Sequence, residues 1–86
     1  MIYNNILEAI GNTPILKYQN NIWLKMENFN PSGSIKDRAA YSMIKSALKR
    51  GEINSNTIII EPTSGNTGIA IAAIGAYFGN PVHIFM

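Results

Sequence analysis

A lysine lies at an unusual place in the segment NPSGSIKDR, residues 30–38. The first residues of this segment are typical of a turn, and Ser34 followed three residues later by Asp37 predicts a capping box. We therefore expect a helix to begin at Ser34. Lys36 then falls in its first turn, where unsatisfied backbone N–H groups carry a partial positive charge. A lysine there is a candidate amine nucleophile or Schiff-base former, provided that its surroundings lower its pKa.

The helix expected over residues 34–50 has an apolar face that leads back to Lys36. Burial beside that face and the positive end of the helix would both lower the pKa of the Lys36 amine. The alternative is that Lys36 extends to water without a chemical role, as isolated lysines beside apolar faces usually do. Gly51 is expected to cap the end of the helix, and Arg38 to pair locally with Asp37. The apolar residues at helical spacing are Ala39, Ala40, Met43, Ile44, Ala47 and Leu48.

A second segment, TSGNTG at residues 63–68, joins an expected strand to an expected helix. Open α/β sheets bind ligands at that position, and accessible N–H groups at a helix start suit a carboxylate or a phosphate. The segment matches neither the dinucleotide-binding pattern nor the P-loop pattern. The alternative is an ordinary strand-to-helix turn with a serine or threonine cap. Combined with Lys36, an anion-binding loop suits pyridoxal phosphate chemistry on amino acids.

An α/β fold is expected to position these segments. The two short strands near the N-terminus should pair in the antiparallel sense, and the last three elements should form a right-handed βαβ unit with parallel strands. The first strand of that unit is apolar enough for burial on both faces, and its helix is apolar nearly all round. The expected elements are a helical turn (1–10), strands (15–18 and 22–26), a loop (27–33), the lysine helix (34–50), a strand (57–61), a helix (66–78) and a strand (82–86).

The composition argues against several classes of function. The 86 residues carry a formal charge of +2 and scattered basic residues, so we expect no nucleic-acid or membrane partner. There is no cysteine, and His83 has no companion ligands, so we expect a packed or edge histidine and no metal. Tyr18, Trp23 and Phe29 are expected in the core. The N-terminus lacks the pattern of a signal peptide, and the expected location is cytoplasmic.

Three segments, in order, resemble the signatures of the β-family (fold type II) pyridoxal-phosphate enzymes. IGNTP at residues 10–14 resembles their N-terminal signature, residues 30–38 their lysine segment, and EPTSGNTG at residues 61–68 their substrate-carboxylate loop. This form of the loop is most similar to that of the cysteine synthase (O-acetylserine sulfhydrylase) and cystathionine β-synthase branch. The resemblance implies that residues 1–86 are the N-terminal part of a catalytic domain in enzymes of about 300 residues, the size of two ordinary domains.

The resemblance also implies roles for individual residues. Lys36 would carry pyridoxal 5′-phosphate through a Schiff base and then, as the free amine, remove the α-proton of the substrate. Asn66 would hydrogen-bond the ring hydroxyl of the cofactor. The reaction implied is β-replacement, in which acetate leaves O-acetylserine and sulfide adds to give cysteine. The residues that would hold the α-carboxylate of the substrate are Thr63, Ser64, Gly65 and Thr67.

Several points stay open at this stage. In the family, the glycine-rich loop that binds the cofactor phosphate lies further along the chain, so we expect the 86 residues alone to be inactive. A cystathionine β-synthase-like or other β-family lyase activity is one alternative. Another is a non-catalytic truncated remnant that associates through an open strand edge. The complete enzyme is expected to be a homodimer that acts on a small amino-acid substrate.

Overall fold

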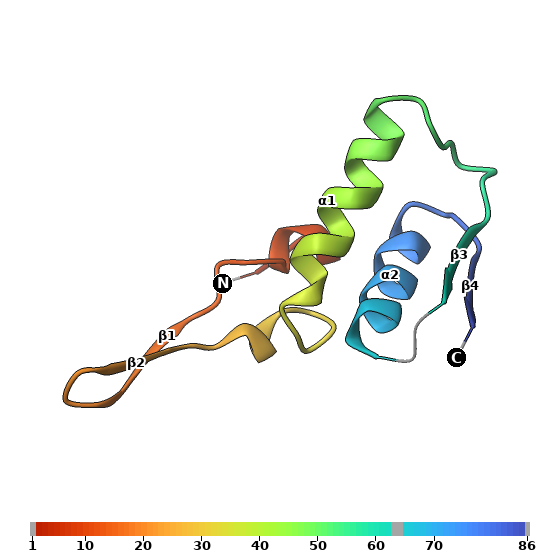
Figure 1. Ribbon diagram of the computed structural model, residues 1–86. Helices are drawn as coiled ribbons and strands as arrows, with labels where there is room; N and C mark the ends of the chain where they lie inside the picture. Colours follow the sequence, from red (N-terminus) through yellow and green to blue (C-terminus); the bar gives the residue numbers. More distant parts are fainter. Residues whose placement is uncertain (1, 63–64, 86) are drawn as a thin grey trace.

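The computed structural model describes residues 2–62 and 65–85 of an elongated chain with extents of 50 × 30 × 21 Å (Figure 1). A hairpin extends from one end, and two helices with a two-stranded parallel sheet form the other. The elements in order are the 3-10 helix η1 (Ile6–Ala9), strands β1 (Ile15–Gln19) and β2 (Ile22–Lys25), the 3-10 helix η2 (Glu27–Phe29), helix α1 (Lys36–Lys49), strand β3 (Ile59–Pro62), helix α2 (Asn66–Tyr77) and strand β4 (Val82–Phe85).

Strands β1 and β2 form the predicted antiparallel hairpin, with Leu16 opposite Leu24. Every residue of both strands is exposed, since no described helix packs over the hairpin (Figure 1). The prediction that Tyr18, Trp23 and Phe29 lie in the core is therefore wrong for this chain, because all of them are exposed on the hairpin or just after it.

Strands β3 and β4 are parallel, as predicted, and α2 connects them. Ile59 lies opposite Val82, and Glu61 opposite Ile84. The helix approaches the sheet closely at Gly75, where a Cβ atom would lie only 2.4 Å from Val82 Cγ2. A glycine is therefore required there by packing rather than by backbone conformation.

Only one face of this parallel sheet is covered. Ile59 and Val82 pack against the core, whereas Ile60 is 61% exposed and Phe85 is also exposed. Helix α2 is likewise buried on one side, and Ile69 on its other side is 55% exposed. The apolar pattern of β3 and α2 suits burial on more sides than the described residues provide, because these place a single layer against the sheet.

Specific hydrogen bonds close the connections between these elements. Gly51, at φ +76°, ends α1 as predicted and donates its N–H to the Leu48 carbonyl at 3.1 Å. Asn80 is buried before β4, and its Nδ2 donates to the carbonyls of Asn54 at 2.7 Å and Thr57 at 2.9 Å. These bonds fix the long connection after α1 to the start of β4.

The core lies between the two helices. Ala40 and Ile44 of α1 pack with Ala70, Ile71 and Ile74 of α2. This contact holds the helices side by side, and both begin at the same end of the molecule, where β3 ends (Figure 1). Within residues 2–62 and 65–85, no helix has the length and apolar character needed to cross a membrane.

Candidate active site

Lys36 is the first residue of α1, and its side chain is exposed. The buried row of the helix runs from Ile44 through Ala40 back to Asp37, which is 1% exposed. The prediction that the apolar face leads back to Lys36 is therefore wrong by one position, a rotation of about 100° around the helix. Among the described residues, no hydrogen bond or ion pair engages the Lys36 amine, so a ligand can reach it.

The turn before α1 differs from the predicted capping box. Ser34 Oγ accepts the N–H of Lys36 at 3.2 Å, but the Asp37 carboxylate does not return to Ser34. Instead, Asp37 Oδ2 accepts the N–H of Ser32 at 2.8 Å. The helix begins at Lys36 rather than at Ser34, because these bonds close a turn over the residues between.

Glu27 in η2 is the centre of a polar cluster that the sequence did not reveal. Its carboxylate accepts hydrogen bonds from Arg38 Nε at 2.7 Å and Nη2 at 3.1 Å. It also accepts from the Thr13 hydroxyl at 2.6 Å and from Asn30 Nδ2 at 3.0 Å. The hydrogen bonds from Arg38, then from Thr13 and Asn30, lower the pKa of Glu27 to about 2. Arg38 therefore pairs with Glu27, and the prediction of a local pair with Asp37 is wrong.

This cluster brings the first two sequence motifs into contact. Asn30 Oδ1 accepts the N–H of Gly11 at 2.8 Å, and the Asn30 carbonyl accepts the N–H of Gly33 at 2.8 Å. Gly11 has φ +76°, and a Cβ atom there would lie 3.0 Å from Arg38 Nη1. The turn that carries Lys36 is thus joined to the IGNTP segment by Asn30 before the turn and by Arg38 after it.

The predicted carboxylate loop is described only in part, since Thr63 and Ser64 lie outside the described residues. Gly65 has an extended backbone directly before α2, and no described residue apart from its chain neighbours has an atom within 4 Å of the place where its Cβ would be. Asn66 begins α2 and is exposed, and Thr67 is half-buried. The first N–H groups of a helix have no acceptor within it, so the start of α2 suits an anion.

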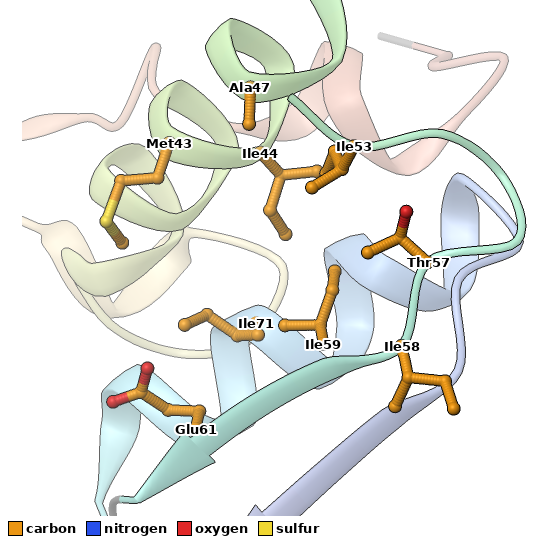
Figure 2. A pocket seen from close by; sticks show the side chains of 9 residues that line it. All are labelled: Met43, Ile44, Ala47, Ile53, Thr57, Ile58, Ile59, Glu61 and Ile71. Atoms are coloured by element: carbon orange, nitrogen blue, oxygen red, sulfur yellow. The ribbon is translucent and has the colours of Figure 1, made fainter. Parts of the chain in front are cut away.

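A separate apolar groove of about 280 Å³ lies between α1 and β3 (Figure 2). None of the side chains that line it carries an amine, and its polar lining groups are those of Thr57 and Glu61. Figure 2 shows them with the apolar lining residues Met43, Ile44, Ala47, Ile53, Ile58, Ile59 and Ile71. Across residues 2–62 and 65–85, no three histidine, cysteine, aspartate or glutamate side chains are grouped so as to hold a metal ion.

The described candidate site residues therefore lie at one end of the molecule. Lys36 begins α1, Asn66 begins α2 directly after Gly65, and β3 ends between these two segments in the chain (Figure 1). Open α/β sheets bind ligands beyond the carboxyl ends of their strands. An amine with an anion-binding helix start suits a ligand that has both a carbonyl carbon and a negative charge.

A family model described as pyridoxal-phosphate dependent enzyme matches residues 6–86. The chain belongs to this family. The match includes the segments at residues 30–38 and 61–68, and it confirms the family that the sequence motifs resembled.

Several relatives of this chain are named cysteine synthase. The cysteine synthase of Aquifex aeolicus is 47% identical over 91 residues, which cover 94% of this chain and 28% of the relative. Cysteine synthase B of Escherichia coli is 51% identical over 86 residues, which cover 92% of this chain and 28% of the relative. The chain thus spans less than a third of the length of these two relatives.

Solved structures confirm the α/β fold of this family member. A hydrogen sulfide-producing enzyme of Fusobacterium nucleatum superposes with a TM-score of 0.91 at 42% identity, over 98% of this chain and 30% of the other. Cysteine synthase of Entamoeba histolytica superposes with a TM-score of 0.90 at 42% identity, over 98% of this chain and 28% of the other. The helices and the parallel βαβ unit therefore correspond to part of these enzymes.

Proposed function

We propose that residues 1–86 are the N-terminal part of a cysteine synthase catalytic domain and carry its reactive lysine. The observation that supports this most is that exposed Lys36 begins α1, and that α1 and α2 begin at the same end of the molecule (Figure 1). The reaction proposed is β-replacement, in which sulfide takes the place of the acetate group of O-acetylserine and cysteine is formed. Relatives named cysteine synthase share about half of their aligned residues with this chain, which favours the same reaction.

The described residues fit pyridoxal 5′-phosphate at its reactive end. The Lys36 amine is exposed and unengaged within residues 2–62 and 65–85, as reaction with an aldehyde requires. Asn66, exposed at the start of α2, offers an amide that can hydrogen-bond the ring hydroxyl. When bound, the cofactor supplies an electron sink for negative charge on the α-carbon of an amino acid. Its phosphate is expected to bind residues outside 1–86.

Lys36 has a second proposed role as the base that takes the α-proton of the substrate at Nζ. Only the neutral amine accepts a proton, so Lys36 must be unprotonated at this step. The exposed position at the first turn of α1 gives the substrate access to Nζ.

The proposed carboxylate site is the loop before α2. Its hydroxyl and N–H groups would hydrogen-bond the α-carboxylate, and the positive end of α2 would favour the negative charge. The surroundings of Gly65 support this role, because no described residue apart from its chain neighbours has an atom within 4 Å of its Cβ position. The proposed residues are Thr63, Ser64, Gly65 and Thr67.

The test uses the product of the complete reading frame that contains this chain. We expect pyridoxal 5′-phosphate to give a visible absorbance band, and borohydride to reduce the new C=N bond to a stable adduct on Lys36. Lys36→Ala should abolish the band, whereas Lys45→Ala, on the exposed side of the same helix, should leave it unchanged. A band that survives Lys36→Ala would exclude the proposed role.

We also propose that the 86 residues alone do not turn over O-acetylserine with sulfide, because the expected phosphate site lies outside them. The measurement is cysteine formation by the isolated chain with added cofactor, and measurable turnover would contradict the proposal. The non-catalytic remnant stays an alternative. An in-frame continuation that carries a glycine-rich phosphate loop would favour the enzyme over the remnant.

A second candidate function differs only in the nucleophile. The O-acetylserine dependent cystathionine β-synthase of Helicobacter pylori superposes with a TM-score of 0.87 at 40% identity, over 98% of this chain and 30% of the other. Turnover with homocysteine in place of sulfide, measured as cystathionine formed, would favour this candidate. For the complete enzyme we further propose a cytoplasmic homodimer, which sedimentation and cell fractionation would test.

A further inference from the structure

We propose that Asp37 is the positioning residue that holds the Lys36 turn, an inference that rests on the function proposed for Lys36. Asp37 follows Lys36 directly and is 1% exposed, so its carboxylate lies inside the fold while the lysine lies outside. Its Oδ2 accepts the N–H of Ser32, five residues earlier, at 2.8 Å. The carboxylate therefore closes the loop from Ser32 to the first turn of α1.

The burial of this carboxylate makes the contact strong. A hydrogen bond to a charged acceptor contributes more than one between neutral groups, and a buried carboxylate without donors is costly. Asp37 Oδ1 and Ser32 Oγ are buried, and neither has a partner among the described residues. The Ser32 N–H is thus the one described donor that compensates Asp37, and moving the turn away from it would leave the charge uncompensated.

The hydrogen bond to Asp37 determines where Lys36 points. Successive residues of a helix differ by about 100° around its axis, so an anchored Asp37 turns Lys36 outward. Ser34 Oγ accepts the backbone N–H of Lys36, and Glu27 pairs with Arg38, two residues after Lys36. The backbone on both sides of Lys36 is therefore anchored, through Ser32 and Ser34 before it and through Asp37 and Arg38 after it.

The test uses variants of the complete reading-frame product. Asp37→Ala removes the acceptor of the Ser32 bond, and Asp37→Asn keeps an oxygen there but removes its charge. Ile44→Ala is the matched control, because Ile44 lies in the same buried row and makes no described hydrogen bond to the turn. All variants are compared under conditions in which circular dichroism shows that they are folded.

The first measurement is the ratio of adduct on Lys36 to adduct on Lys45 after limited pyridoxal 5′-phosphate and borohydride. The amine and aldehyde lose one water to form C=N, and borohydride supplies the hydride that reduces it. We expect Asp37→Ala to lower the ratio roughly tenfold, as for loss of one hydrogen bond to a charged group, Asp37→Asn to lower it less, and Ile44→Ala to leave it unchanged.

The second measurement, hydrogen exchange at the N–H groups of Ser32 and Lys36, needs no cofactor. We expect faster exchange in Asp37→Ala and wild-type exchange in Ile44→Ala. Faster exchange in Asp37→Ala, together with no preference for Lys36 in the wild-type labelling, would support the position of Asp37 and exclude the function proposed for Lys36. Unchanged exchange in Asp37→Ala, or equal effects in Ile44→Ala, would overturn the role of Asp37.

Discussion

The two regions that meet at α1 are stabilised in different ways. Around the start of α1, side chains distant in sequence are joined by polar contacts, with Glu27 bound to Thr13, Asn30 and Arg38. Around α2, the contacts are apolar, and the sheet packs at the bare backbone of Gly75. We therefore expect the stability of the region around the start of α1 to depend on charge and pH. The stability of the βαβ region should depend on side-chain volume.

The largest loss of stability is expected from Ile74→Ala, in the apolar region. Ile74 is 1% exposed in the core, so removing its side chain leaves a cavity that should cost about 2–5 kcal/mol in the free energy of unfolding. Ile69→Ala, on the exposed side of the same helix, is the control and should cost far less. Denaturant unfolding followed by circular dichroism measures both, and equal losses would contradict the one-sided packing of α2.

A smaller loss of stability in the same region is expected from Gly75→Ala. The added methyl group would meet Val82 Cγ2 at 2.4 Å, and overpacking of this kind costs about 1–3 kcal/mol. Val82→Ala removes the clashing atom, so the double variant should lose less stability than the two single losses combined. Additive losses would show that the helix and strand do not meet as described.

The smallest change in stability is expected from Glu27→Gln, and it should be detected mainly at acidic pH. The pKa of Glu27 is about 2 in the folded chain against an ordinary value of 4.5. Between these values the unfolded chain binds more protons, so stability contributed by Glu27 is present above pH 4.5 and lost as the pH falls towards 2. The free energy of unfolding should depend less on pH in Glu27→Gln than in wild type over this range. Glu61→Gln is the control, because the Glu61 carboxylate makes no hydrogen bond or ion pair within the described residues.

Much of the fold follows from local sequence patterns. Apolar periodicity and turn residues predicted both helices, the hairpin and the parallel βαβ unit, with boundaries that differ from the structure by only a few residues. Burial was less predictable, because an apolar run such as that around Ile60 indicates an affinity for a second layer without showing that this chain supplies one. The same reason explains the exposed α2 residue Ile69.

The site was predictable as a set of segments but not as a set of contacts. Lys36 was identified from its place in a turn and helix, yet its side of the helix was predicted wrongly, because the buried row ends at Asp37. Glu27 was missed because its partners Thr13 and Arg38 are 14 and 11 residues away, beyond the reach of helical or strand spacing. Contacts of this kind depend on how the hairpin returns to α1.

The exposed hairpin determines what a fluorescence experiment on this chain would report. Trp23 is the single tryptophan of the sequence, lies on β2 and is 61% exposed, with Lys17 Nζ 5.6 Å from its ring centre. Its emission should therefore be that of a solvated indole in the folded chain and should change little when the helical core melts. Intrinsic fluorescence would instead be a sensitive reporter of any partner surface that covers the hairpin.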